Sequence, residues 1–171
     1  MSAGTGAAAC GIAAVCWLQS SNFPVSLVIE ALSRWQRGKP RAAALQDATR
    51  VVTWAELATR VRDLAWRFSA GRCHCIAIHA ENSIDWVIAD LAANLNAATV
   101  IPVPSFFSDR QVLHLLNTAP VDTLLGDDSV RTVELEPDFV QVPTPVGSMA
   151  MYRRAGSDGA GQAQVGQAAK I

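Results

Sequence analysis

The residues of this chain best suited to bind a metal ion are Cys73-His74-Cys75, followed at a short distance by His79. Thiolates and imidazoles are the ligands that zinc prefers, so the run is a candidate metal site. On an extended strand, however, Cys73 and Cys75 point to one face and His74 to the other. Three ligands on one strand cannot then converge on one tetrahedral ion, and no second Cys or His pair follows at a zinc-like spacing. We therefore favour small, buried thiols over a metal site.

His79 is a second candidate, because a base beside the carboxylates of Glu81 or Asp85 could transfer a proton. It ends a predicted strand, and open α/β sheets bind their ligands at the carboxyl ends of the strands. The alternative, which we favour, is that His79 caps the turn that follows the strand. The third histidine, His114, lies inside an amphipathic pattern, and we expect it to be structural.

The glycine-rich end of the chain, residues 156–171, resembles a phosphate-binding loop in composition and contains Lys170. Such a loop needs a buried strand before it and a helix N-terminus after it, because the aligned N–H groups bind the phosphate. Residues 149–154 form a weak strand pattern at best, and only Ile171 follows the lysine. The composition therefore predicts a linker tail.

The overall composition fits one globular domain with a sizeable core. The chain has 171 residues, of which 50% are hydrophobic and 17% charged, and its formal net charge is −1. This balance favours neither nucleic acid nor an anionic membrane surface as a partner. Four cysteines are too few for a disulfide scaffold in a chain of this size, so we expect reduced thiols and a cytoplasmic protein.

Residues 7–18 are apolar but too short to span a bilayer, and no basic segment precedes them. A signal peptide and a short helix packed on the domain are the two interpretations, and we favour the helix.

The hydrophobic periodicity predicts alternating helices and strands. Helices are expected at 23–38, 53–71, 83–95 and 108–117, and strands at 42–46, 51–52, 73–80, 99–103 and 122–125, with weaker strand patterns at 131–135 and 139–142. Capping boxes begin two of the helices, at Thr53 with Glu56 and at Ser108 with Gln111. Pro102 is expected to help end its strand.

This alternation predicts the α/β class, with a layered parallel sheet flanked by helices over roughly residues 40–127. We divide the chain into an N-terminal extension (1–22), an α/β subdomain (23–150) and a linker tail rich in Gly, Ala and Gln (151–171).

Four segments in order carry a resemblance to one family. Residues 51–57 (VVTWAEL) resemble its "lTyaEL" motif, 81–86 (ENSIDW) its "NS-x-e-w" turn and 91–104 (LAANLNAATVIPVP) its "aGavvvPlp" segment; residues 108–126 resemble the helix and strand that follow. The family is the adenylate-forming (AMP-binding) superfamily of acyl-CoA synthetases, fatty acyl-AMP ligases and peptide-synthetase adenylation domains. The resemblance covers about residues 27–127. The family glycine falls on Ala97, which suggests a different helix end there.

The resemblance implies an ATP-dependent ligase that activates a carboxylic acid, which we expect to be a fatty acid, as an acyl-adenylate and passes it to a thiol such as CoA. It also implies the N-terminal subdomain of the acyl-CoA synthetase-like fold, and ATP, Mg and CoA for the full-length family. The family's phosphate loop and catalytic lysine lie beyond the matched region, so the resemblance assigns no catalytic, cofactor-binding or metal-binding residue here. Phe106-Phe107-Ser108 favours acyl-CoA synthetases over peptide-synthetase domains.

Two functional hypotheses follow. In the first, the chain is an inactive N-terminal fragment of such a ligase, whose partner is the remainder of the synthetase chain. In the second, it is a truncated, non-catalytic paralogue that acts as a binding or interaction module. In both, we expect self-association through an exposed apolar surface.

Overall fold

A computed structural model describes residues 27–127, 135, 139–143, 147 and 149–156 of the chain. The extension 1–22, residues 23–26 of the first expected helix, most of the expected strand 131–135 and the tail from 157 lie outside them. The elements in chain order are α2 (Leu27–Gly38), β1 (Ala43–Gln46), β2 (Val51–Thr53), α3 (Trp54–Ala70), β3 (Cys75–His79), α4 (Ile84–Leu95), β4 (Thr99–Val103), α5 (Asp109–Thr118), β5 (Thr123–Gly126), β6 (Phe139–Val142) and β7 (Ala150–Arg154).

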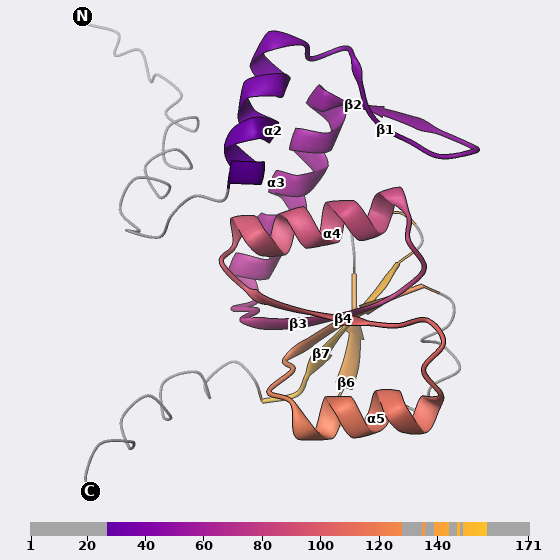
Figure 1. Cartoon of the computed structure of the whole chain (residues 1–171). Helices are drawn as coiled ribbons and strands as arrows, with labels where there is room; N and C mark the ends of the chain where they lie inside the picture. The colour runs from indigo at the N-terminus through magenta and orange to yellow at the C-terminus, as the bar shows by residue number, and fades with distance from the viewer. Residues whose placement is uncertain (1–26, 128–134, 136–138, 144–146, 148, 157–171) are drawn as a thin grey trace, which may run out of the picture.

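The main sheet has five strands in the order β4-β3-β5-β7-β6, and helices lie on both sides of it (Figure 1). β3 pairs in parallel with both β4 and β5, whereas β7 is antiparallel to both β5 and β6. The expected α/β class is therefore confirmed, but the sheet is mixed and not wholly parallel. Parallel neighbours need a long crossover, usually a helix, and the proline-punctuated sequence after β5 carries no helical pattern.

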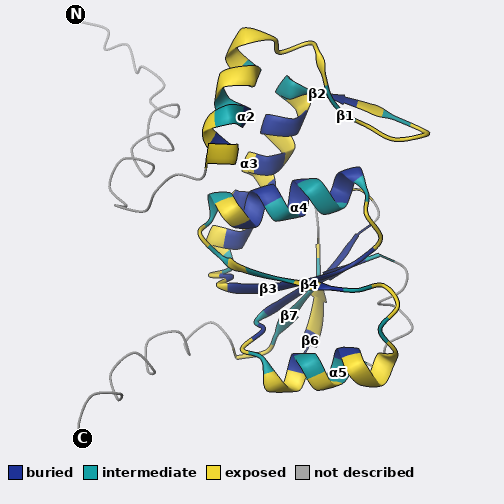
Figure 2. Ribbon diagram, in the orientation of Figure 1, coloured by how far each residue is buried: buried dark blue, intermediate teal, exposed yellow. Residues whose placement is uncertain are grey.

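The sheet is covered on both faces. Ile76 and Ile78 of β3 belong to a buried cluster with residues of α3 and α4, whereas Ala77 and Leu124 belong to a second cluster with Val112 and Leu116 of α5. Alternate residues of a strand point to opposite faces, so these two clusters lie on opposite sides of the sheet. In Figure 2 the central strands are accordingly dark blue along their length.

The N-terminal helices are joined to the β1–β2 hairpin through local contacts. The Thr53 side chain accepts a hydrogen bond from the backbone N–H of Glu56, and Glu56 accepts one from the Thr53 N–H, which confirms the capping box. The rings of Trp35 and Trp54 stack with centroids 5.6 Å apart, and Lys39 Nζ lies 5.3 Å from the Trp35 ring centroid. These contacts fix α2 against the start of α3. The capping box at Ser108 is also present.

β4 differs from the expectation in two ways. Pro102 lies inside the strand, opposite Ile78, and does not end it. The strand is also only partly buried, because β4 is an edge strand of the sheet. Since an edge strand has one row of backbone groups that pairs with no neighbour, proline is tolerated there.

The end of the domain also needs correction. Residues 151–154, which the sequence analysis placed in the linker tail, belong to β7, and β7 pairs on one side with β5 and on the other with β6. The boundary at residue 150 is therefore wrong. The sequence of β7 gives a weak strand pattern because its last two residues, Arg153 and Arg154, are charged. Both guanidinium groups bind backbone carbonyls, Arg153 that of Gly71 and Arg154 those of Leu116 and Val121.

Helix α4 ends in a conformation that favours glycine. Ala97 has φ +54°, in the left-handed region that residues with a Cβ rarely adopt. The glycine of the resembling family falls at this position, so the backbone turns as glycine would allow.

We predict that Ala97→Gly stabilises the protein by about 0.5–1 kcal/mol, because it removes left-handed strain that slightly exceeds the added freedom of the unfolded chain. Ala97 is exposed, so no packing is lost. Chemical denaturation measures the change. Ala31→Gly, at a half-buried position in the interior of helix α2, is the control and should destabilise. Equal destabilisation by both substitutions would contradict the prediction.

Candidate functional site

The Cys73-His74-Cys75 run is arranged differently from the expectation. Cys73 and Cys75 are buried, free thiols, and His74 is exposed. β3 begins only at Cys75, so strand alternation does not extend back to Cys73. Cys73 packs in the cluster of α3 and α4, and Cys75 in the cluster of α5. The expectation that both cysteines share one face is therefore wrong, since Cys73 lies before the start of β3.

Neither thiol is suited to act as a nucleophile. Burial raises the pKa of Cys73 and of Cys75 above the usual range, so both remain protonated near neutral pH. Across the residues that the structure describes, no group of three or more His, Cys, Asp or Glu side chains is placed to hold a metal ion.

His79 lies at the carboxyl end of β3, as expected, and is 2% exposed. Its Nδ1 lies 3.4 Å from the Val103 carbonyl oxygen, at the end of the neighbouring strand. It forms no hydrogen bond or ion pair with Glu81 or Asp85, all three being within the described residues. The backbone N–H of Glu81 instead donates to Asp127 Oδ2 at 3.0 Å. The structure therefore does not assemble the base and carboxylate pair that would transfer a proton.

Asp85 has a different partner, which sequence reasoning missed. Its Oδ1 lies 3.0 Å from Nη2 of Arg50, in the turn that connects β1 to β2. Asp85 is buried, whereas the Arg50 side chain is 35% exposed, and the pairing raises the pKa of the guanidinium. An aspartate within an apolar helix signals a cationic partner, because a carboxylate is almost never fully buried without one.

A third segment meets this ion pair at Gly147. A Cβ built on Gly147 would lie 2.0 Å from Asp85 Oδ2, and Gly147 has φ +46°. Both the close approach and the left-handed backbone require glycine here. Asp85 therefore joins the hairpin, the first turn of α4 and the segment before β7. Its place in the fold is structural.

Asp122 likewise serves the framework. Its Oδ2 accepts hydrogen bonds from the backbone N–H groups of His74 and Cys75, at 2.8 and 2.9 Å. This carboxylate links the entrance of β3 to that of β5 and satisfies backbone donors that lie before the strand ladder.

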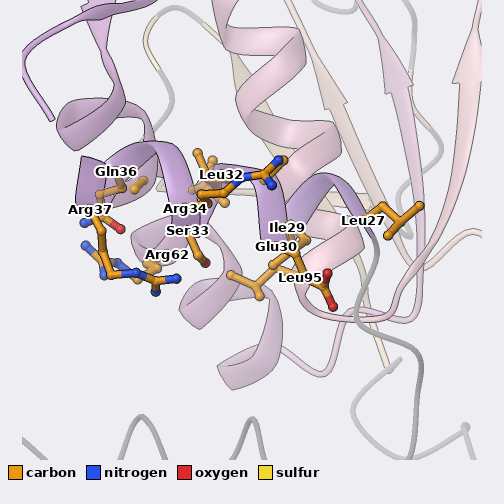
Figure 3. A pocket seen from close by; sticks show the side chains of 13 residues that line it. Leu27, Ile29, Glu30, Leu32, Ser33, Arg34, Gln36, Arg37, Arg62 and Leu95 are labelled. Atoms are coloured by element: carbon orange, nitrogen blue, oxygen red, sulfur yellow. The ribbon is translucent and has the colours of Figure 1, made fainter. Parts of the chain in front are cut away.

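Among the surface pockets of the described residues, two are lined mainly by residues of helices. The larger, of about 800 Å³, is a groove between α2, α3 and the end of α4 (Figure 3). Its floor is apolar, and Glu30, Arg34, Arg37 and Arg62 line it as well. The second, of about 580 Å³, lies beside α5 and includes Phe107, Arg110 and His114. His114 is exposed there, which differs from a packed role in the core.

The Arg50–Asp85 pair gives a testable prediction about stability. We expect Arg50→Ala to destabilise by about 2–3 kcal/mol, because it leaves a buried carboxylate without its cation; the partial exposure of Arg50 keeps the loss below that of a fully buried pair. Asp85→Ala should cost less, since Arg50 can reach water. Denaturation of both single variants and the double variant should give a coupling energy of about 1–2 kcal/mol.

Asp63→Ala is the matched control, because Asp63 is an exposed aspartate of α3, and it should change stability by less than about 0.5 kcal/mol. Additive effects of Arg50→Ala and Asp85→Ala would contradict a stabilising pair.

The sequence matches one protein family over most of its length. The family model described as AMP-binding enzyme matches residues 32–169. A curated relative is the 3-[(3aS,4S,7aS)-7a-methyl-1,5-dioxo-octahydro-1H-inden-4-yl]propanoyl:CoA ligase of Rhodococcus jostii, which is 26% identical over 125 residues. That alignment covers 68% of this chain and 24% of the relative.

Solved structures agree with this family. An artificially fused adenylation–PCP di-domain, NpsA–ThdA from Klebsiella oxytoca, is 26% identical with a TM-score of 0.58, over 67% of this chain and 22% of that one. The o-succinylbenzoate CoA synthetase MenE of Bacillus subtilis is 25% identical with a TM-score of 0.52, over 57% of this chain and 21% of that one.

The chain thus spans about a quarter of the length of the relatives it matches. The matched motifs, the mixed α/β sheet and the family match over most of the sequence agree with one another. The chain belongs to the AMP-binding enzyme family, and it corresponds to the N-terminal part of an adenylate-forming ligase.

Proposed function

We propose that this chain is the N-terminal part of a ligase that uses ATP to activate a fatty acid as an acyl-adenylate and transfers the acyl group to CoA. The observation that carries the proposal is the family match over residues 32–169. Two of the similar proteins, the CoA ligase of Rhodococcus jostii and the o-succinylbenzoate CoA synthetase of Bacillus subtilis, support CoA as the acceptor. ATP, Mg and CoA would then be required by the complete enzyme.

Fewer observations support the choice of CoA over a carrier protein as the thiol acceptor. One of the similar structures contains a PCP domain, so a carrier-bound thiol is the competing acceptor. Phe106 is 84% exposed after β4, and its ring lies 5.7 Å from that of Phe107 in an edge-to-face contact. This aromatic pair follows the proline-rich turn in the position that favours acyl-CoA synthetases.

The chain by itself is proposed to be inactive. The carboxylates of Asp85 and Asp122 are used in structural contacts, and His79 is buried against a backbone carbonyl. The sequence contains no run rich in Ser, Thr and Gly that ends in Pro-Lys-Gly. The described residues therefore supply a framework, and the groups that bind and polarise phosphates would come from further chain.

A reduced, cytoplasmic environment suits the free thiols of Cys73 and Cys75. Among the described residues, no helix is long and apolar enough to cross a bilayer.

ATP–pyrophosphate exchange tests this proposal. With octanoic, palmitic and aromatic acids as substrates, we expect the purified chain to show no exchange above the background without enzyme. The same chain extended by its continuing reading frame should exchange with at least one acid and release AMP when CoA is added.

The DNA that follows codon 171 supplies the matched observation. An open frame leading into a Ser/Thr/Gly-rich loop with Pro-Lys-Gly supports the ligase, and a natural stop supports the interaction module. Exchange by the 171-residue chain itself would overturn the proposed inactivity. Release of AMP with a carrier protein and not with CoA would overturn the choice of acceptor.

The competing function, an interaction module, would use a feature of the surface that a ligase fragment would also have. Large apolar side chains are exposed on several elements, including Trp66 on α3 at 70%, Phe106 at 84% and Val140 on β6 at 56%. β6 is also an edge strand of the described sheet. Exposed edges and apolar side chains favour association, so we propose that the chain forms dimers or larger assemblies.

Sedimentation velocity over a range of concentrations tests the self-association, which should appear as a rising weight-average sedimentation coefficient. Val140→Lys should shift the protein towards monomer, because a charge on an edge strand opposes pairing between copies. Asn117→Lys, at an exposed position of α5 and away from the edge strand, is the control for added charge. A strictly monomeric wild-type protein at high concentration would refute the proposal.

A further inference from the structure

Basic residues from two helices meet on one groove. Arg34 and Arg37 lie on α2 and Arg62 lies on α3, and all three line the groove of about 800 Å³ between these helices. In Figure 3 the side chains of Arg37 and Arg62 reach the same end of the groove from the two helices. All three side chains, called here the groove arginines, are exposed, so their charges are accessible to a partner.

The groove carries more positive charge than the described residues neutralise. Among those residues, no carboxylate forms an ion pair with the groove arginines. Of the described residues that line the groove, Glu30 alone is acidic. Residues 27–70 contain eight Lys or Arg against four Asp or Glu, whereas the whole chain has 14 against 15. The excess of positive charge therefore belongs to this part of the fold, and it favours an anionic partner.

Carboxylates are anions that suit this arrangement. The planar guanidinium group of arginine can bind a carboxylate through two parallel N–H···O hydrogen bonds. The floor of the groove consists of apolar side chains such as Leu32 and Val61, which are already buried and need no cover of their own. They keep water away from one side of the arginines, and charges attract each other more strongly beside such a low-dielectric surface. A carboxylate in the groove is therefore held more firmly than one on a flat, hydrated surface.

Two features favour a peptide over a nucleic acid as the partner. Among the described lining residues there is no aromatic side chain on which the bases of a single strand could stack. Glu30 also lies toward the other end of the groove from Arg37 and Arg62 (Figure 3), about 10 Å from Arg37 along the helix axis. A continuous row of phosphates would be repelled there, whereas a peptide can place a neutral or basic residue opposite Glu30.

We propose that the groove between α2 and α3 binds an acidic peptide segment of a partner protein, whose Asp or Glu side chains pair with the groove arginines. In an extended segment about three residues span 10 Å, so the residue opposite Glu30 lies about three positions from the acidic ones and is not itself acidic. The proposal goes beyond the ligase function and does not depend on it, because it involves no reacting group. A nucleic acid and a second copy of the chain are the competing occupants.

Fluorescence anisotropy with the full chain and labelled peptides tests the proposal. The probe is a peptide of alternating Glu and Ala, and its matched control has Gln in place of every Glu. We expect the Glu peptide to bind and the Gln peptide not to bind. Arg37→Gln and Arg62→Gln should each raise the Kd of the Glu peptide by about two- to fivefold, as expected for exposed ion pairs. Glu30→Gln should lower that Kd by about twofold, because it removes a repulsion.

The double variant Arg60→Gln with Arg67→Gln is the matched control, because it removes the same charge from exposed positions of α3 outside the groove. It should change the Kd by less than about twofold. The proposal is overturned if this control weakens binding as much as Arg37→Gln with Arg62→Gln does, or if the Gln peptide binds equally well. Tighter binding of an oligothymidine strand to the same arginines would assign the groove to nucleic acid. Loss of self-association in Arg37→Gln with Arg62→Gln, measured by sedimentation, would assign it to a second copy, and either result would also overturn the proposal.

Discussion

The burial of β3 on both faces is the constraint on which the rest of the structure depends. All five residues of β3 are buried, and all four of β5 beside it are buried too. Such strands are stable only when both faces of the sheet are covered, which α3 and α4 do on one side and α5 on the other. Strands and helices alternate along the chain, so the crossover helix α4 packs on one face of the sheet and the next crossover helix, α5, packs on the other.

Sequence reasoning succeeded for features that depend on neighbouring residues of the chain. The cores of the helices and the capping residues Thr53 and Ser108 were predictable, because caps and periodicity are local signals. The partners of charged residues were not. Asp85 was assigned to the neighbourhood of His79, six residues away, yet it pairs with Arg50, and the contact depends on where the β1–β2 hairpin lies. Pattern alone could show that Asp85 needed a cation, but only the fold could identify which one.

Cys73 and β7 show the two other ways in which local reasoning failed. Alternation was extended across Cys73, although the strand begins two residues later, and a one-residue error reverses the face to which a side chain points. Residues 149–154 showed only a weak strand pattern, because the last two residues of β7 are arginines. Their guanidinium groups instead bind carbonyls of α5 and of the loops after α3 and α5, contacts that no pattern in β7 itself reveals.

The position of β7 has a consequence for how the protein is made. β7 is the last strand described, yet it lies in the interior of the described sheet, and within that sheet β6 is hydrogen-bonded to β7 alone. During synthesis, β6 leaves the ribosome before the strand that will hold it in place. The interval is short, roughly a second at typical elongation rates. β5 leaves the ribosome before both of them, so its edge stays unpaired until β7 follows, and an unpaired edge can bind a chaperone or another nascent chain.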